Sequence, residues 1–174
     1  LHILDIAQNG IEAGATALEI DLLEDPAADL LTIEVRDNGR GMSREACERA
    51  LDPFFTTRTT RRVGMGLPLL AAAARASGGS LTLDSQPGAG TGVRATFHLG
   101  HIDRPPLGDL QTTLLVLMAG SPSADIRFRH TVGDRGYELR SSDLRAALEG
   151  GSLAGPEGVA LVREAIRRGE RALG

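Results

Sequence analysis

Two short stretches of the chain carry side chains that suit the binding of a nucleotide. In residues 5–15, Asp5, Asn9 and Glu12 share one face of a helix, because positions three and four apart are neighbours on a helical surface. Residues 37–42 form a glycine-rich turn that presents one carboxylate. A carboxylate can accept a hydrogen bond from an adenine amino group, and an Asn oxygen can bind a hard cation that carries phosphates. Together the two stretches predict a nucleotide pocket.

The elements that must position these residues follow from apolar spacing. Residues 1–13 have an apolar stripe opposite the polar one, which predicts a helix that ends at Gly14. Alternating apolar residues predict strands at 17–23 and 31–36. Further along the chain, the pattern predicts a helix at 43–51, a mobile loop at 52–63, a helix at 67–77, and strands at 80–85 and 92–99.

This order of elements predicts an α+β fold, a two-layer α/β sandwich in which helices cover one face of a mixed sheet. The sequence indicates a boundary at 101–106 and hence two domains, residues 1–100 and 101–174. The second is a small α+β C-terminal unit that we expect to pack on the first. Its predicted elements are helices at 107–118, 142–148 and 156–173 and strands near 126–132 and 137–139. Arginines alternate along those strands, and we expect them to form either a partner surface or, preferably, a solvated sheet edge: Arg127, Arg129, Arg135 and Arg140.

Composition limits the classes of function. The net charge of −4 argues against a nonspecific nucleic-acid or anionic-membrane surface. No apolar run approaches the roughly 20 residues of a membrane span, and no signal peptide is visible, so we expect a cytoplasmic protein. All 19 basic residues are Arg. Any cationic role in catalysis must therefore fall to Arg, which cannot donate or take up a proton.

Four motifs, taken in order, resemble those of the GHKL group of ATPases. This group includes DNA gyrase, Hsp90-type chaperones, histidine kinases and MutL-type proteins, which share the Bergerat ATP-binding fold. Residues 5–15 look like the N-box, 37–42 like the G1 box, 52–58 like the F-box of histidine kinases, and 64–67 like the G2 box. Residues 88–91 match the turn before the last strand. The resemblance covers roughly residues 1–99 and implies the cofactors ATP and Mg²⁺.

The resemblance gives roles to the residues of the first helix. Asn9 would ligate the Mg²⁺ that bridges the phosphates. Asp5 stands where the ATP-hydrolysing branches have a Glu that orients and deprotonates water, so we expect Asp5 to be the general base. Asp is one methylene shorter than Glu, and the alternative role for Asp5 is an indirect contact with the Mg²⁺, through one of the groups that bind the metal directly. Glu12 replaces an Asp of the pattern and would tune the site.

The resemblance also assigns the adenine side of the pocket. Asp37 would accept from the adenine amino group, and Thr91 would hold a water beside it. Gly39 and Gly41 let the backbone approach the base without an intervening Cβ. Met42 would supply an apolar wall.

The phosphates are expected at the start of the helix at 67–77. Free backbone N–H groups at a helix N-terminus form an anion site, which here involves Gly64, Gly66 and Leu67. Arg58 and Arg62 of the preceding loop would reach the γ-phosphate when this loop closes as a lid. Arg62 occupies a position where kinases usually have a glycine.

Three functions remain open from the sequence. The first is a slow Mg²⁺-dependent ATPase that acts as a conformational switch or accessory protein for an unidentified protein partner, with a homodimer as one possible assembly. The second is a histidine-kinase-type phosphotransfer module. The third is an anti-sigma-like regulator that binds ATP with little turnover.

Overall fold

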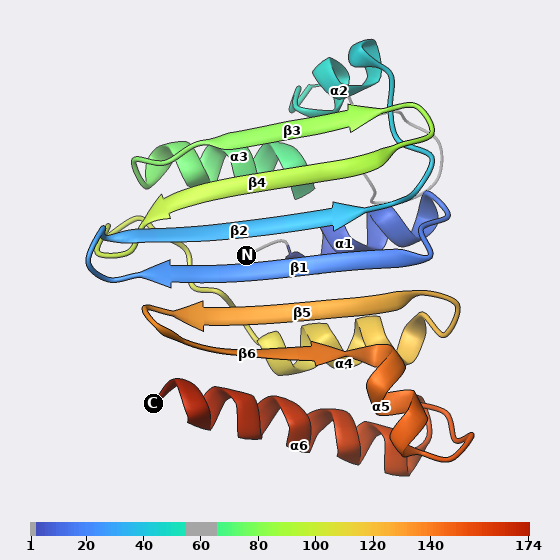
Figure 1. The fold of residues 1–174 in the computed structure, drawn as a ribbon. Coiled ribbons are helices and arrows are strands. Elements are labelled where there is room, and N and C mark those ends of the chain that lie inside the picture. Colours follow the sequence, from blue (N-terminus) through green and yellow to red (C-terminus); the bar gives the residue numbers. More distant parts are fainter. Residues whose placement is uncertain (1–2, 55–65) are drawn as a thin grey trace.

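The computed structural model describes residues 3–54 and 66–174 of the chain. The elements, in chain order, are α1 (Ile3–Glu12), β1 (Ala17–Asp25), β2 (Leu30–Asp37), α2 (Arg44–Ala50), α3 (Gly66–Ala76), β3 (Leu81–Gln86), β4 (Gly90–His98), α4 (Leu110–Gly120), β5 (Asp125–Val132), β6 (Arg135–Arg140), α5 (Ser141–Ala147) and α6 (Pro156–Leu173). The strands form one six-stranded sheet in the order β3-β4-β2-β1-β5-β6 (Figure 1). Strands β1 and β5 run parallel and the other neighbours run antiparallel, so the sheet is mixed.

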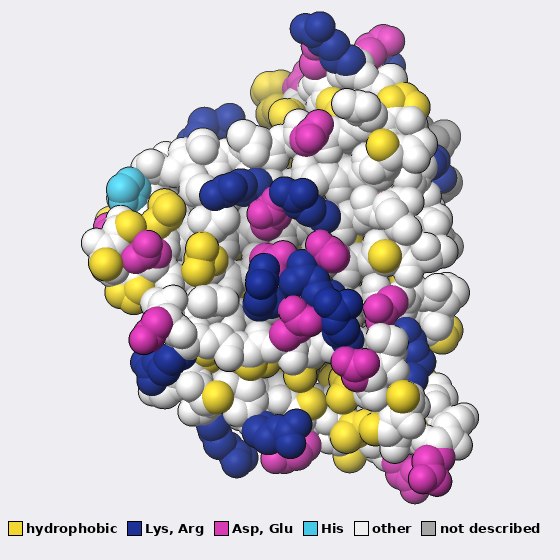
Figure 2. Space-filling model, viewed as in Figure 1, with side chains coloured by type: hydrophobic (Ala, Val, Ile, Leu, Met, Phe, Trp, Pro, Cys, Tyr) yellow, Lys and Arg dark blue, Asp and Glu magenta, His cyan; other side chains and the backbone are white. Residues whose placement is uncertain are grey.

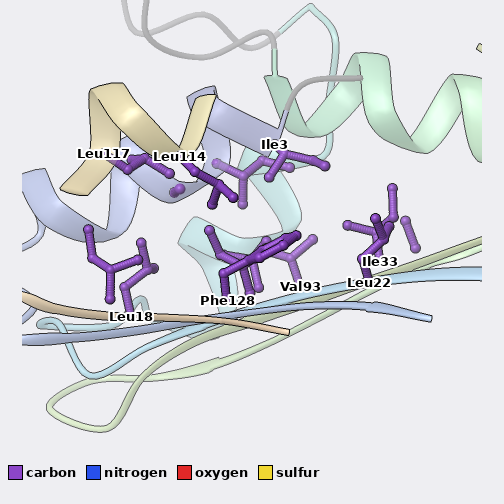
Figure 3. Packing of buried hydrophobic residues seen from close by; sticks show 14 of the residues in the cluster. Ile3, Leu18, Leu22, Ile33, Val93, Leu114, Leu117 and Phe128 are labelled. Atoms are coloured by element: carbon purple, nitrogen blue, oxygen red, sulfur yellow. The ribbon is translucent and has the colours of Figure 1, made fainter. Parts of the chain in front are cut away.

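One face of the sheet carries the core. Alternate residues of a strand point to the same face, and in β1 these are Leu18, Ile20 and Leu22, each at most 1% exposed. The same alternation in β2 and β4 buries a second set: Ile33, Val35, Val93, Ala95 and Phe97. Figure 3 shows these strand side chains meeting Ile3, Leu114 and Leu117 from the helices above them. Burial of aliphatic side chains from both layers therefore fixes the helices on this face.

The helices α1, α3 and α4 cover the apolar face of the sheet, while α6 packs against β6 and α4 (Figure 1). Their buried residues follow helical spacing, as in α1 with Ile3, Ile6, Ala7 and Gly10. The predicted two-layer α+β sandwich, with helices on one face of a mixed sheet, is confirmed. Within the part of the chain that the structure describes, no helix is long and apolar enough to cross a bilayer.

The C-terminal part of the chain, residues 101–174, extends the same sheet. Strand β5 lies beside β1 with Leu18 opposite Ile126 and Ile20 opposite Phe128, and β6 then pairs with β5 as the edge strand. Ile126 and Phe128 are buried in the common core. The elements of residues 101–174 thus continue the layers formed by the first 100 residues. The division into two domains, residues 1–100 and 101–174, stays a prediction.

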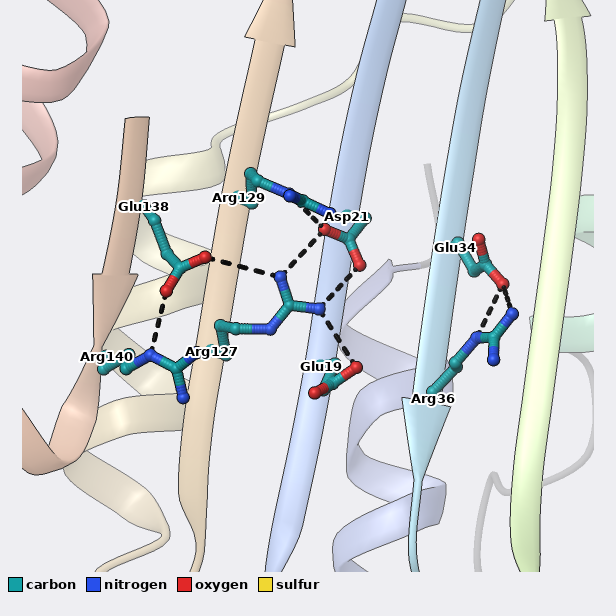
Figure 4. Close-up of polar contacts among 8 residues, drawn as sticks. All are labelled: Glu19, Asp21, Glu34, Arg36, Arg127, Arg129, Glu138 and Arg140. Atoms are coloured by element: carbon teal, nitrogen blue, oxygen red, sulfur yellow. Dashed lines mark hydrogen bonds and ion pairs between the residues drawn. The ribbon is translucent and has the colours of Figure 1, made fainter. Parts of the chain in front are cut away.

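The other face of the sheet carries a network of ion pairs rather than a helical layer. Figure 2 shows basic and acidic side chains gathered over the middle of this face. At the centre of the network, Arg127 contacts three carboxylates on two strands: Glu19 at 3.0 Å and Asp21 at 2.9 Å on β1, and Glu138 at 3.6 Å on β6 (Figure 4). Burial raises the pKa of the Asp21 carboxyl, but the hydrogen bonds from Arg127 and Arg129 outweigh burial and lower it.

This network corrects the expectation of a solvated sheet edge. Arg127 and Arg129 belong to β5, which is an interior strand, and the Arg127 side chain is only 11% exposed. Arg135 and Arg140 do lie on the edge strand β6, where Arg140 pairs with Glu138 at 2.8 Å. The sequence could not show this difference because Glu19 and Asp21, which hydrogen-bond to Arg127, are more than one hundred residues away from it.

Candidate functional site

At one end of the sheet, the buried apolar residues of the strands give way to polar residues. Asp37 follows Ile33 and Val35 in phase along β2, so its side chain lies on the helix-covered face. Strand register places Asp37 opposite Thr91, and Thr91 opposite Ser85. These three residues form a polar row across β2, β4 and β3. The row lies where the buried face of the sheet opens to solvent.

Beside this polar row lies a pocket of about 480 Å³. This volume falls in the range that small-molecule ligands occupy. Seven of the residues predicted from the sequence line the pocket: Asn9, Asp37, Gly41, Met42, Gly66, Leu67 and Thr91. Further lining residues are Ile6, Gly10, Glu12, Ala13, Val35, Arg40, Ala46, Arg49, Ala50 and Val93. The pocket therefore combines an apolar wall with a few convergent polar groups.

The Asp37 carboxylate is held in a fixed position. The backbone N–H of Gly39 donates to Asp37 Oδ1 at 2.8 Å. Within residues 3–54 and 66–174, no hydrogen bond to Asp37 Oδ2 is formed. Gly10 of α1 packs directly against this carboxylate, since an ideal Cβ at Gly10 would lie 2.9 Å from Oδ2. Asp37 thus offers the pocket one preoriented acceptor.

The glycine turn after β2 is held by hydrogen bonds to two other segments, the start of β1 and the β3–β4 turn. Asn38 Oδ1 accepts from the backbone N–H groups of Thr16 and Ala17, both at 2.9 Å. The Gly88 N–H donates to the Arg40 carbonyl at 2.7 Å. Gly41 has φ of +67°, and a Cβ there would lie 1.9 Å from the Gln86 carbonyl oxygen. Only glycine fits at this position, because it has both the positive φ and the close backbone approach. Of the two predicted glycines, Gly39 orients Asp37 and Gly41 lines the pocket.

Helix α1 brings Asn9 and Asp5 to different parts of the site. Asn9 is half-buried and lines the pocket. Asp5 lies one turn earlier, is exposed, and is not among the residues that line the pocket. It instead lies beside the start of α3, where a Cβ built on Gly66 would be 3.1 Å from Asp5 Cβ. The structure thus places Asp5 on the side of α1 that faces the N-terminus of α3.

The start of α3 forms another wall of the pocket. Gly66 and Leu67 both line it, and the first backbone N–H groups of a helix have no intrahelical acceptor. This arrangement suits an anion. The predicted contacts from Arg58, Arg62 and Gly64, and most of the predicted loop at 52–63, lie outside the described residues.

Gly10 and Ser85 are among the contributors to the site that were missed from the sequence. The position of Gly10 within a predicted helix could have indicated a close contact, because a glycine there costs roughly 1 kcal/mol of stability relative to Ala and so usually has a packing reason. Ser85 contacts Thr91 across the β3–β4 hairpin at 2.8 Å. Its position could have been read from the register of that hairpin, since the turn before Gly90 fixes which residues face each other.

Comparison with known proteins agrees with this geometry. Residues 2–101 match the family model described as histidine kinase-, DNA gyrase B-, and HSP90-like ATPase. The chain is similar to the sensor protein kinase FleS of Pseudomonas aeruginosa, with 40% identity over 63% of this chain and 26% of that protein. It is also similar to the non-motile and phage-resistance protein of Caulobacter vibrioides, with 31% identity over 59% of this chain and 13% of that protein.

A third relative matches nearly the whole chain. The DNA mismatch repair protein MutL of Anaeromyxobacter dehalogenans is 30% identical over 95% of this chain and 32% of that protein. The chain thus spans about a third or less of the length of these relatives. The family match covers more than half of the chain, and it includes the helix, the glycine turn and the strands that build the pocket. The chain belongs to the histidine kinase-, DNA gyrase B- and HSP90-like ATPase family, the GHKL superfamily.

Proposed function

We propose that this protein binds Mg²⁺ and ATP in the pocket between α1, the glycine turn and α3, and hydrolyses ATP slowly as a conformational switch. One observation carries the proposal: Asn9 and Asp37, from two separate motifs, line the same pocket of about 480 Å³. Family membership supports ATP as the ligand. The switch would act on a protein partner, which co-purification would identify, or within a homodimer. We propose a cytoplasmic location and a role in signal transduction.

The donors in the pocket fit both cofactors. Mg²⁺ takes oxygen ligands and is usually held by one or two protein groups together with water and phosphate oxygens. The Asn9 amide oxygen is such a group. When bound, the metal ion neutralises part of the phosphate charge and fixes the phosphates in position. The Asp37 Oδ2 acceptor and the apolar wall at Val35, Met42 and Val93 match the amino edge and the faces of a purine.

The proposed chemistry assigns a task to each element of the site. Water attacks the γ-phosphorus, the bond to the bridging oxygen breaks, and the ADP oxygen leaves with the electron pair. Asp5 accepts the proton of the attacking water. The N–H groups at the start of α3 and the arginines Arg58 and Arg62 stabilise the charge of the transferred group. Turnover would be slow, because closure of a lid and encounter with a partner commonly limit such switches.

Replacing Asp37 by Asn is the direct test of nucleotide binding. The Asn oxygen would keep the bond from the Gly39 N–H, so its NH₂ group would face the pocket and oppose the donor of the base. We expect wild-type protein to bind Mg²⁺–ATP and Asp37→Asn to lose roughly 10- to 100-fold in affinity, measured by isothermal titration calorimetry. Asp84→Asn is the matched control, since Asp84 is an exposed carboxylate of β3 outside this pocket. Failure of the wild type to bind ATP would refute the proposal.

Gly10→Ala tests the close packing behind the carboxylate. The added methyl group would lie 2.9 Å from Asp37 Oδ2 and must displace it. We expect affinity for ATP to fall roughly tenfold, the scale of one hydrogen bond to a charged group, while Ala favours the helix itself. Gly120→Ala in α4 is the control, because among the described residues no atom beyond its chain neighbours and the backbone of its own helix lies within 4 Å of its Cβ position. Equal affinities in calorimetry for both variants would show that Gly10 does not set the position of Asp37.

Phosphotransfer to a protein is the second candidate, favoured by relatives that are named sensor kinases. Incubation with labelled ATP distinguishes the candidates. A slow ATPase releases inorganic phosphate at steady state, whereas a kinase module produces an acid-labile, base-stable phosphoprotein. A nucleotide-binding regulator of the anti-sigma type would bind ATP and release no phosphate above background.

A further inference from the structure

Ser85 lies behind Thr91, on the side away from the nucleotide pocket. It is not one of the residues that line this pocket, but its hydroxyl contacts three groups around it. Ser85 Oγ accepts from the Met42 N–H at 2.8 Å and donates to the Gly90 carbonyl at 2.9 Å. It also lies 2.8 Å from Thr91 Oγ1. The side chain therefore joins the glycine turn, the β3–β4 turn and the polar row.

Counting protons fixes the direction of the Ser85–Thr91 hydrogen bond. A Ser hydroxyl has one proton and two lone pairs. The Gly90 carbonyl has no proton to give, so Ser85 uses its proton there. The contact with Thr91 must then run from the Thr91 hydroxyl to Ser85 Oγ. Ser85 is thereby saturated, and the lone pairs of Thr91 Oγ1 are left to face the pocket.

We propose that Ser85 is a positioning residue that holds Thr91 as a hydrogen-bond acceptor and so selects a 6-amino purine over a 6-keto purine. The inference rests on the proposed function, because it concerns the base bound in the same pocket. Asp37 Oδ2 and Thr91 Oγ1 then present two acceptors to one edge of the base. A 6-amino group, or a water beside it, brings protons to that edge. A 6-keto oxygen brings only lone pairs to the place of the 6-amino group, where acceptors oppose acceptors, and the proton of a 6-keto purine lies on N1 instead.

Without Ser85, the Thr91 hydroxyl is free to turn its proton into the pocket and donate to a 6-keto oxygen. ATP and inosine triphosphate (ITP) are the probes, because ITP replaces the 6-amino group by a keto group and keeps the phosphates. We expect wild-type protein to bind ATP more tightly than ITP. In Ser85→Ala, we expect the dissociation constant for ITP divided by that for ATP to fall roughly tenfold, which corresponds to about 1.4 kcal/mol. Calorimetry with Mg²⁺ present measures both constants.

Two comparisons separate this role from a structural one. Ser80→Ala removes a similar hydroxyl from the other end of the same hairpin, where Ser80 Oγ lies 3.3 Å from Thr96 Oγ1, and should keep the wild-type ratio. Ser85→Thr retains a hydroxyl and should restore the ratio. Since Ser85 acts through the Thr91 hydroxyl, adding Ser85→Ala to Thr91→Val should leave the ratio of the single Thr91→Val variant unchanged.

The outcomes distinguish the inference from the function on which it rests. If wild type binds ATP and Ser85→Ala weakens ATP and ITP equally, Ser85 only supports the fold and the inference is overturned. If wild type binds neither nucleotide, the proposed function fails and the inference fails with it. If Ser85→Ala does not fold by circular dichroism, Ser85→Cys takes its place, because a thiol is a weak hydrogen-bonding group.

Discussion

Asn9→Ala should abolish Mg²⁺-dependent binding of ATP. Asn9 is the neutral oxygen donor of α1 that lines the pocket, and Ala offers no ligand in its place. Without this ligand the proposed metal ion would lose its position beside α1, and the phosphate charge would be left uncompensated. We expect a loss of roughly 100-fold or more in affinity, because changing even an outer partner of a metal ligand typically costs about 10- to 100-fold. Isothermal titration calorimetry with and without Mg²⁺ measures this loss.

Gln8→Ala is the control for the loss of an amide from α1. Gln8 is the neighbouring residue, carries the same functional group and is exposed rather than directed to the pocket. Its affinity for Mg²⁺–ATP should equal that of the wild type. Unchanged affinity in Asn9→Ala would end the assignment of Asn9 to the metal ion, even if ATP still binds through Asp37.

Asp5→Asn should spare ATP binding and remove turnover. An amide cannot accept the proton of the attacking water, and a positioned general base contributes typically 10²- to 10⁴-fold to a rate. Asp5 does not line the pocket, so the ground-state contacts to the nucleotide should survive its replacement. We therefore expect kcat for phosphate release to fall by about 100-fold or more, with the dissociation constant for ATP nearly unchanged.

Glu12 is the competing carboxylate on the same helix and provides the matching test. Unlike Asp5, Glu12 lines the pocket. If Glu12→Gln loses turnover while Asp5→Asn remains fully active, the base is Glu12 and the assignment of Asp5 is wrong. A joint loss in both variants would instead indicate that the two carboxylates share the work of orienting the water.

Short-range patterns in the sequence were enough to predict most of this fold. The alternation at Leu18, Ile20 and Leu22 gave β1 and its buried face. The paired motifs also brought Asn9 and Asp37 to one pocket. The strand prediction succeeded because it depends on residues that are close in the chain, whereas the pairing of Asn9 with Asp37 rested on the order of the motifs.

The remaining features depend on contacts between distant residues, and local patterns do not encode these. The approach of Gly10 to Asp37 requires the packing distance between α1 and β2. The role of Ser85 requires both the register of the β3–β4 hairpin and the position of the glycine turn at Met42. The burial of Arg127 requires the parallel pairing of β5 with β1. Local periodicity predicted both of these strands but did not show that they are neighbours.

The parallel pairing of β5 with β1 also prevents β1 from pairing with a strand of another protein molecule. Over residues 17–24, β1 has β5 as its neighbour on the side away from β2. A chain cut after residue 100 would turn β1 into a long edge strand with a row of unsatisfied N–H and C=O groups. Such an edge is a template for pairing with another chain, and therefore for aggregation. In the full chain, the exposed edge passes to the shorter β6, which carries the charged residues Arg135, Glu138 and Arg140 and is thus a poorer template.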